Sequence, residues 1–178
     1  MIAIDSGSAQ AKSAAFALAT GWENYMNSTD KMTSCLSEMR KAAIDIICQT
    51  GYADDSVYDS LEKSYINNFI SPEPDFDEIK KTLKALAAIN TDKTVDLLFI
   101  FLQGLHQKKH KGIWTIKERR IFPWVVTAIA LSKIKSRNIW NLLMVIFRTD
   151  LYSNSERMYA KNALIRIKAA NQHPAAQD

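Results

Sequence analysis

The amino-acid sequence predicts an all-α protein of about eight helices, and three observations support this fold class. Apolar residues recur every three or four positions in successive segments, which is the period of one helix face. Only 5 of the 178 residues are glycine and 4 are proline, few for a chain built of strands and tight turns. Capping residues precede several of the periodic segments.

The first three predicted helices occupy the acidic part of the chain. Each carries apolar side chains at helical spacing, such as Leu18, Trp22 and Met26 in the first helix. Gly51 follows the second helix, where glycine adopts the left-handed conformation that ends a helix at little cost. The three predicted ranges are 9–26, 30–48 and 54–69.

The later helices are delimited by proline, capping residues and glycine. The two prolines of the segment SPEPDF interrupt the chain, because the residue before a proline disfavours the helical conformation. Asp75 with Glu78 has the spacing of a capping box, which opens a helix. Thr115 with Glu118 has the same spacing, and Gly112 ends the helix before them. The predicted ranges are 75–89, 94–111, 115–134, 136–149 and 153–170, followed by a frayed tail at 171–178.

Charge changes sign near the proline break. Residues 1–78 hold 5 Lys and Arg against 13 Asp and Glu, a net charge of −8, whereas residues 79–178 hold 18 against 6, a net charge of +12. Opposite charges attract within a molecule or between molecules. Self-association through the acidic and basic halves is therefore one expectation, and attraction of an acidic partner is another.

The same pattern occurs twice in the second half of the chain. The stretch LAAINTDKTVDLLFIFL (86–102) aligns without gaps on LSKIKSRNIWNLLMVIF (131–147), an offset of 45 residues. A third partial copy follows, because Ala163, Leu164 and Ile167 repeat an earlier pattern at an offset of 33 residues. A period of this size, holding two antiparallel helices, is typical of repeat solenoids.

The final helix carries the closest likeness to a known family. It has Arg, Ala, Ala-Leu and Ile at the spacing of HEAT repeats, and an aspartate precedes them; the residues are Asp150, Arg157, Ala160, Ala163, Leu164 and Ile167. The chain therefore resembles HEAT repeats over residues 75–170, although Ile79 and Trp124 stand where the arginine would be. The resemblance implies a short right-handed HEAT-like α-α superhelix. An acidic helical segment at 1–70 precedes it, and its residues 30–69 resemble a degenerate repeat more weakly. HEAT proteins mostly bind other proteins; some bind nucleic acid, and one branch removes damaged DNA bases.

One candidate site is the concave face that such a solenoid would form. If the most apolar positions of helices 94–111 and 136–149 face the core, the opposite side of both helices carries polar residues around Phe99 and Met144. The six candidate residues are Asp96, Phe99, Gln103, Asn141, Met144 and Arg148. Apolar groups rimmed by polar ones are typical of protein-binding surfaces, so another protein is the partner we expect. Asp96 near Phe99 is the only hint of a base-excision site.

The alternative site is a basic patch in the loop between two helices. It consists of Lys108, Lys109, Lys111, Trp114, Lys117, Arg119 and Arg120. Such a patch could hold phosphates while the indole stacks on a base, which would indicate a nucleic-acid partner. A solvated loop with Trp114 packed over the core is the favoured interpretation, because no base-reading motif accompanies the charge.

The remaining polar residues predict neither catalysis nor a cofactor. His106 and His110 could face one metal ion, but two ligands do not make a site, and they equally complement the negative end of a helix. Cys35 and Cys48 lie about 20 Å apart on one predicted helix, so we expect reduced thiols and a cytoplasmic location. No stretch reaches the roughly 20 apolar residues that span a bilayer, so we expect no membrane partner. We expect a non-enzymatic protein without metal or cofactor.

Overall fold

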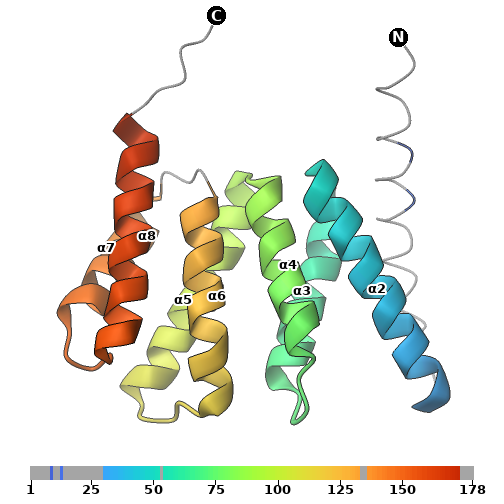
Figure 1. Cartoon of the computed structure of the whole chain (residues 1–178), viewed down its shortest axis with the longest axis horizontal. Helices are drawn as coiled ribbons and strands as arrows, with labels where there is room; N and C mark the ends of the chain where they lie inside the picture. Colours follow the sequence, from blue (N-terminus) through green and yellow to red (C-terminus); the bar gives the residue numbers. More distant parts are fainter. Residues whose placement is uncertain (1–8, 10–12, 14–29, 53, 133–135, 173–178) are drawn as a thin grey trace, which may run out of the picture. The chain divides into compact units, whose positions relative to one another are not determined.

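The computed structural model describes residues 9, 13, 30–52, 54–132 and 136–172. Within these residues the chain is all-α, with seven helices and no strand (Figure 1). The helix predicted at 9–26 lies outside the described residues except for its residues 9 and 13, and so do residues 173–178 of the predicted tail. The helices are α2 (Asp30–Thr50), α3 (Asp55–Ile70), α4 (Phe76–Ile89), α5 (Asp92–His110), α6 (Ile116–Leu131), α7 (Arg137–Arg148) and α8 (Asn154–Gln172).

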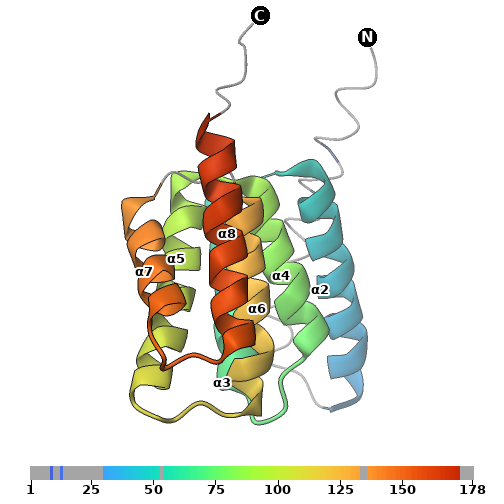
Figure 2. The ribbon, with the colours of Figure 1, turned by 60° about the vertical axis from the view of Figure 1, so that its left-hand side comes forward.

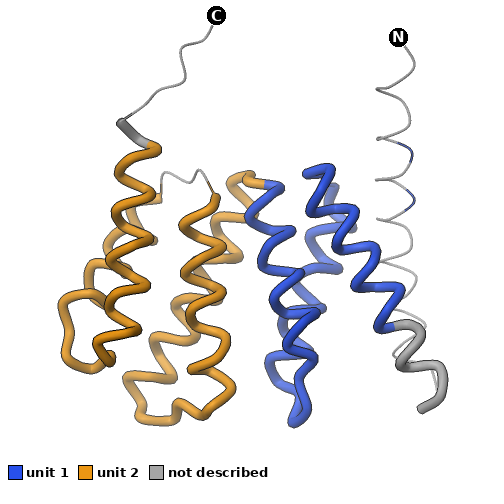
Figure 3. Tube along the Cα trace, viewed as in Figure 1, with its two compact units in different colours: residues 1–89 blue, residues 90–178 orange. Residues whose placement is uncertain are grey.

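The chain divides into two compact units, residues 1–89 and 90–178 (Figure 3). In unit 1, α2 and α3 both pack against α4. The proline-containing segment therefore connects two helices of one unit, where it joins α3 to α4. The buried apolar side chains of this unit are Ala43, Ile44, Ile47, Val57, Tyr58, Leu61, Tyr65, Ile79, Leu83, Ala85, Leu86, Ala87 and Ile89.

Unit 2 consists of two antiparallel helix pairs, α5 with α6 and α7 with α8 (Figure 2). The pairs stack on each other, because α6 packs on α8 and α5 packs on α7. The predicted core positions Leu98, Phe101, Leu143 and Ile146 are buried, and Leu142 is half-buried. Each helix pair therefore contributes one helix to each of two layers in this unit.

The predicted helix ends are local features of the structure. Thr115 and Glu118 form the complete capping box at the start of α6. Gly51 (φ +63°) and Gly112 (φ +69°) adopt the left-handed conformation after α2 and α5. At the start of α4 the prediction is half right: Asp75 accepts a hydrogen bond from the Glu78 backbone N–H at 3.0 Å, but the Glu78 side chain bonds Arg40 on α2.

No helix in the described ranges is long and apolar enough to cross a membrane.

Candidate functional site

The six residues predicted for a protein-binding face all lie on α5 and α7 of unit 2. Asp96, Gln103, Asn141 and Arg148 are exposed, whereas Phe99 and Met144 are half-buried. Phe99 and Met144 are thus partly covered by their neighbours, more than the sequence pattern suggested.

Two exposed apolar residues on the same helix faces were missed by the sequence analysis. Ile100 and Val145 each expose about half of their surface. Spacing explains their position, because residues three and four apart on a helix share one face. We call the combined surface the α5/α7 face; its residues are Asp96, Phe99, Ile100 and Gln103 on α5 and Asn141, Met144, Val145 and Arg148 on α7.

The two halves of the α5/α7 face repeat each other. Each of the four α5 positions of this face has its counterpart on α7 45 residues later, as Ile100 has Val145 and Phe99 has Met144. Because α5 and α7 pack on each other, the two apolar pairs belong to neighbouring helices of one layer. An open hollow of about 440 Å³ lies beside the α7 half, lined by Met144, Val145, Arg148 and Thr149.

Trp114 of the predicted basic patch packs over the core of unit 2. Its indole N–H donates a hydrogen bond to the Leu105 carbonyl at 2.8 Å. Its ring centroid lies 5.4 Å from that of Phe122 and 5.7 Å from that of Tyr152, and the Lys109 ammonium lies 4.2 Å from it. An indole held in this way by its edge and faces is not presented for stacking on a nucleic-acid base.

Two lysines of the basic patch form ion pairs. Lys108 bonds Glu118 at 2.8 Å, and Lys109 bonds Glu156 at 3.1 Å. Burial by itself would raise the pKa of Glu118, but hydrogen bonds from Lys108 and Thr115 lower it to about 2. The exposed cations of the patch are Lys111, Arg119 and Arg120, and Lys117 is half-buried.

His106 makes a hydrogen bond to a tyrosine on the neighbouring helix pair. Its Nδ1 lies 2.8 Å from the Tyr152 hydroxyl, and the two rings stack with centroids 6.0 Å apart. The His110 ring contacts the same imidazole edge-on, at 5.9 Å between centroids. Burial, and then the nearby His110, lower the pKa of His106, which favours the neutral imidazole. Within the described ranges, no three His, Cys, Asp or Glu side chains come together as metal ligands.

A buried ion pair in unit 1 was not predicted from the sequence. Arg40 on α2 is 3% exposed and Glu78 on α4 is fully buried. Arg40 donates through Nε and Nη2 to the two carboxylate oxygens at 3.2 and 3.0 Å, and the Ser64 hydroxyl donates to Oε1 of Glu78 at 2.7 Å. The available signal was the position of Arg40 on the apolar face of its helix, three residues before the buried Ala43.

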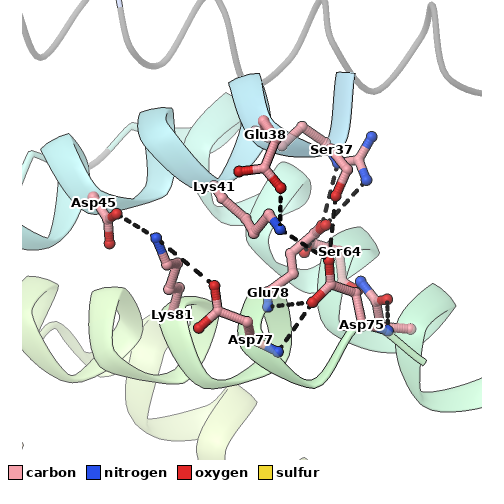
Figure 4. A network of polar contacts seen from close by, with 11 residues as sticks. Ser37, Glu38, Lys41, Asp45, Ser64, Asp75, Asp77, Glu78 and Lys81 are labelled. Carbon is pink, nitrogen blue, oxygen red and sulfur yellow. Dashed lines mark hydrogen bonds and ion pairs between the residues drawn. The ribbon is translucent and has the colours of Figure 1, made fainter. Parts of the chain in front are cut away.

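More exposed ion pairs extend this contact along the α2–α4 seam. Figure 4 shows Lys41 between Glu38 and Asp75, and Lys81 facing Asp45. These side chains satisfy one another rather than converge on an empty space, so the cluster holds α2 on α4 and offers no evident place for a ligand. Cys48, further along α2, is half-buried, and burial raises the pKa of its thiol, which disfavours the reactive thiolate.

Comparison of the chain with models of known protein families, with curated proteins and with solved structures finds no match.

Proposed function

We propose that this chain is a non-enzymatic protein-binding module of HEAT-like architecture, and that the α5/α7 face is its binding surface. The observation that carries the proposal is the repeat of Phe99–Ile100 as Met144–Val145 on two helices that pack together. Solenoid proteins bind partners on surfaces built from equivalent positions of successive repeats.

The composition of the α5/α7 face fits a protein partner. Its four central residues are apolar, and its outer positions are polar or charged, with Asp96 at one end of α5 and Arg148 at the end of α7. An apolar centre with a polar rim is the usual organisation of a protein interface. The partner surface that complements it has an apolar stripe, a base opposite Asp96 and an acid opposite Arg148.

Two features of unit 2 support the HEAT-like architecture. Its two antiparallel helix pairs pack side by side, α5 on α7 and α6 on α8, which is the arrangement expected of a 45-residue repeat. Arg157 and Asp150, two of the residues on which the resemblance rests, form an ion pair at 2.7 Å. A right-handed superhelical path through the whole chain belongs to the proposal.

Paired charge substitutions on the α5/α7 face test this function. Ile100→Glu with Val145→Glu places two carboxylates at the centre of the face, at positions exposed enough to keep the fold. Each buried charge opposite an apolar partner surface costs several kcal/mol, so partner capture should fall by at least about a hundredfold. The measurement is affinity capture of binding proteins by the tagged full chain, quantified by mass spectrometry.

Ile165→Glu on α8 is the matched control, because Ile165 is as exposed as Ile100 but lies on the other layer of unit 2. The control should capture the same proteins as the wild type. If the doubly substituted chain captures them equally well, the α5/α7 face is not the binding surface and the proposal fails.

A further inference from the structure

Two isoleucines are strongly exposed at the end of unit 2 that carries the α5–α6 loop. Ile116, in the first turn of α6, is 84% exposed, and Ile113, in the loop, is 55% exposed. Ile116 is the most exposed large hydrophobic residue among those that the structure describes. Single exposed hydrophobic residues are common on protein surfaces, but two within four positions at the tip of a loop form a small apolar prominence.

Basic residues flank these two isoleucines in the sequence. Lys111 precedes Ile113, and Lys117, Arg119 and Arg120 follow Ile116. Lys111, Arg119 and Arg120 are exposed to solvent.

The acids at this end are paired with other cations. Glu118 pairs with Lys108, Glu156 with Lys109, and Asp150 with Arg157. Each of these three pairs is neutral overall, so the exposed Lys111 and Arg119 give this end a positive charge.

Local hydrogen bonds tie the loop that carries Ile113 to the ends of α5 and α6. Gly112 takes the left-handed conformation, and the Ile113 backbone N–H donates to the Lys108 carbonyl at 3.1 Å. The Thr115 capping box and the Trp114 hydrogen bond to Leu105 fix the residues that follow. The side chains of Ile113 and Ile116 are exposed to water, and transfer of such side chains from water into an apolar environment is favourable.

The second loop of unit 2 extends the same end. Trp114 contacts Tyr152, which belongs to the α7–α8 loop, and Figures 1 and 2 place both loops at one end of the unit. Leu151, next to Tyr152, is also exposed. We call this surface the loop end; its residues are Lys111, Ile113, Ile116, Lys117, Arg119, Arg120 and Leu151.

We propose that the loop end docks on the surface of an anionic lipid bilayer. Ile113 and Ile116 enter the boundary between headgroups and acyl chains, while the exposed Lys111 and Arg119 contact acidic headgroups. Apolar groups combined with basic ones are what interfacial membrane binding requires. Such binding needs no spanning helix, so it is compatible with the absence of spanning candidates in the described ranges. It departs from the expectation of no membrane partner, which rested on bilayer-spanning stretches alone.

The isoleucines favour lipid over nucleic acid as the anionic partner. A nucleic acid would gain from the cations and from an exposed aromatic ring, but Trp114 is packed against Phe122 and Tyr152. Exposed aliphatic side chains gain little next to phosphates, whereas transfer into an acyl region is favourable for them.

The test measures co-sedimentation of the full chain with phosphatidylcholine vesicles that contain or lack phosphatidylserine. Binding is expected only with phosphatidylserine and should weaken as salt is added. Ile113→Ser with Ile116→Ser should weaken binding by at least about tenfold. Lys111→Gln with Arg119→Gln should weaken it by about fivefold for each cation removed.

Matched controls come from the exposed surface of α8, away from the loop end. Ile165→Ser removes an isoleucine as exposed as Ile113, and Lys161→Gln with Lys168→Gln removes two exposed cations; both variants should bind vesicles like the wild type. Ile100→Glu with Val145→Glu should also keep vesicle binding, so failure of the protein-binding proposal and failure of this one are distinguishable.

Three results would overturn the proposal. One is no binding to phosphatidylserine vesicles at low salt, and another is vesicle binding that the serine substitutions leave unchanged. The third is tighter binding to a single-stranded DNA oligonucleotide than to vesicles, without any effect of the serine substitutions, which would reassign the loop end to nucleic acid. Circular dichroism of each variant checks that the helices are retained.

Discussion

Removing one partner of the buried Arg40–Glu78 pair should destabilise unit 1 strongly. Glu78→Leu deletes the acceptor of three hydrogen bonds, and the two from Arg40 are each worth about 1.5–3 kcal/mol. It also leaves a guanidinium that is only 3% exposed without its counter-charge. Breaking a buried ion pair costs about 3–5 kcal/mol, so the two arguments agree on the size. Arg40→Met should cost a similar amount, because it leaves the fully buried carboxylate of Glu78.

Replacing both partners should restore most of the stability. The double variant Arg40→Met with Glu78→Leu buries two apolar groups of similar volume, a change that is often neutral or stabilising. The expected free energy of unfolding is therefore within about 2 kcal/mol of the wild type, against a loss of roughly 6–10 kcal/mol if the two single losses added.

Urea unfolding at 25 °C, followed by circular dichroism, measures these free energies. Lys81→Met is the matched control on the same seam, because the Lys81–Asp45 pair is partly exposed and such pairs contribute about 0–1 kcal/mol. A double variant as unstable as the sum of the single variants would refute the coupling. Single variants that lose less than about 1 kcal/mol would refute the burial of the pair.

Three further predictions concern unit 2. Burial lowers the pKa of His106 below 6.5, so the unfolded chain binds a proton at this imidazole more tightly than the folded chain does. The free energy of unfolding should therefore fall as the pH drops below about 6.5. His106→Gln should reduce this fall when the urea midpoint is measured against pH. Glu118, with its pKa lowered from 4.5 to about 2, contributes stability that is present above pH 4.5 and is lost as the pH falls toward 2; Glu118→Gln should lower the melting temperature at pH 7 and flatten this acid limb. Gly112→Ala should lower the free energy of unfolding by about 1 kcal/mol, because the φ of Gly112 is +69°. Gly104→Ala inside α5 should raise it by about 0.5–1 kcal/mol, because a Cβ at either glycine meets nothing within 4 Å but Gly104 is helical. Equal effects of the two substitutions in thermal melts would contradict the left-handed backbone at Gly112.

The helix boundaries were predictable because their determinants are local. A capping box such as Thr115 with Glu118 acts within four residues, and a glycine such as Gly112 ends a helix through its own backbone conformation. The apolar period then indicates which side of each helix is buried. These features are readable from the sequence without any knowledge of which helices meet.

The contacts between helices were not predictable in the same way. Arg40 and Glu78 are 38 residues apart, and no local pattern states that α2 packs on α4. The spacing of Asp75 and Glu78 suggested that the Glu78 side chain caps α4. In the structure the Glu78 carboxylate instead accepts hydrogen bonds from the buried guanidinium of Arg40. Trp114 illustrates the converse, because its surroundings in sequence are cationic and polar while its ring is held by Leu105, Phe122 and Tyr152.

The candidate surfaces were found in part. The α5/α7 face was predicted from the side of each helix opposite the core, but the exposure of Ile100 and Val145 depends on how closely neighbouring helices approach. Likewise, periodicity cannot distinguish Ile116, exposed at the start of α6, from Ile121, which is buried within it. The start of a helix can extend beyond the packed layer, and only the tertiary arrangement shows where that happens.

Unit 2 holds all three tryptophans that the structure describes. Of the four tryptophans, Trp114, Trp124 and Trp140 belong to unit 2, and Trp22 lies outside the described residues. In a Trp22→Phe background, intrinsic tryptophan emission would therefore come from unit 2 alone. Circular dichroism would still record the helices of both units. The difference in denaturant midpoint between the fluorescence and circular-dichroism transitions would then report whether the two units unfold together or in sequence in the intact chain.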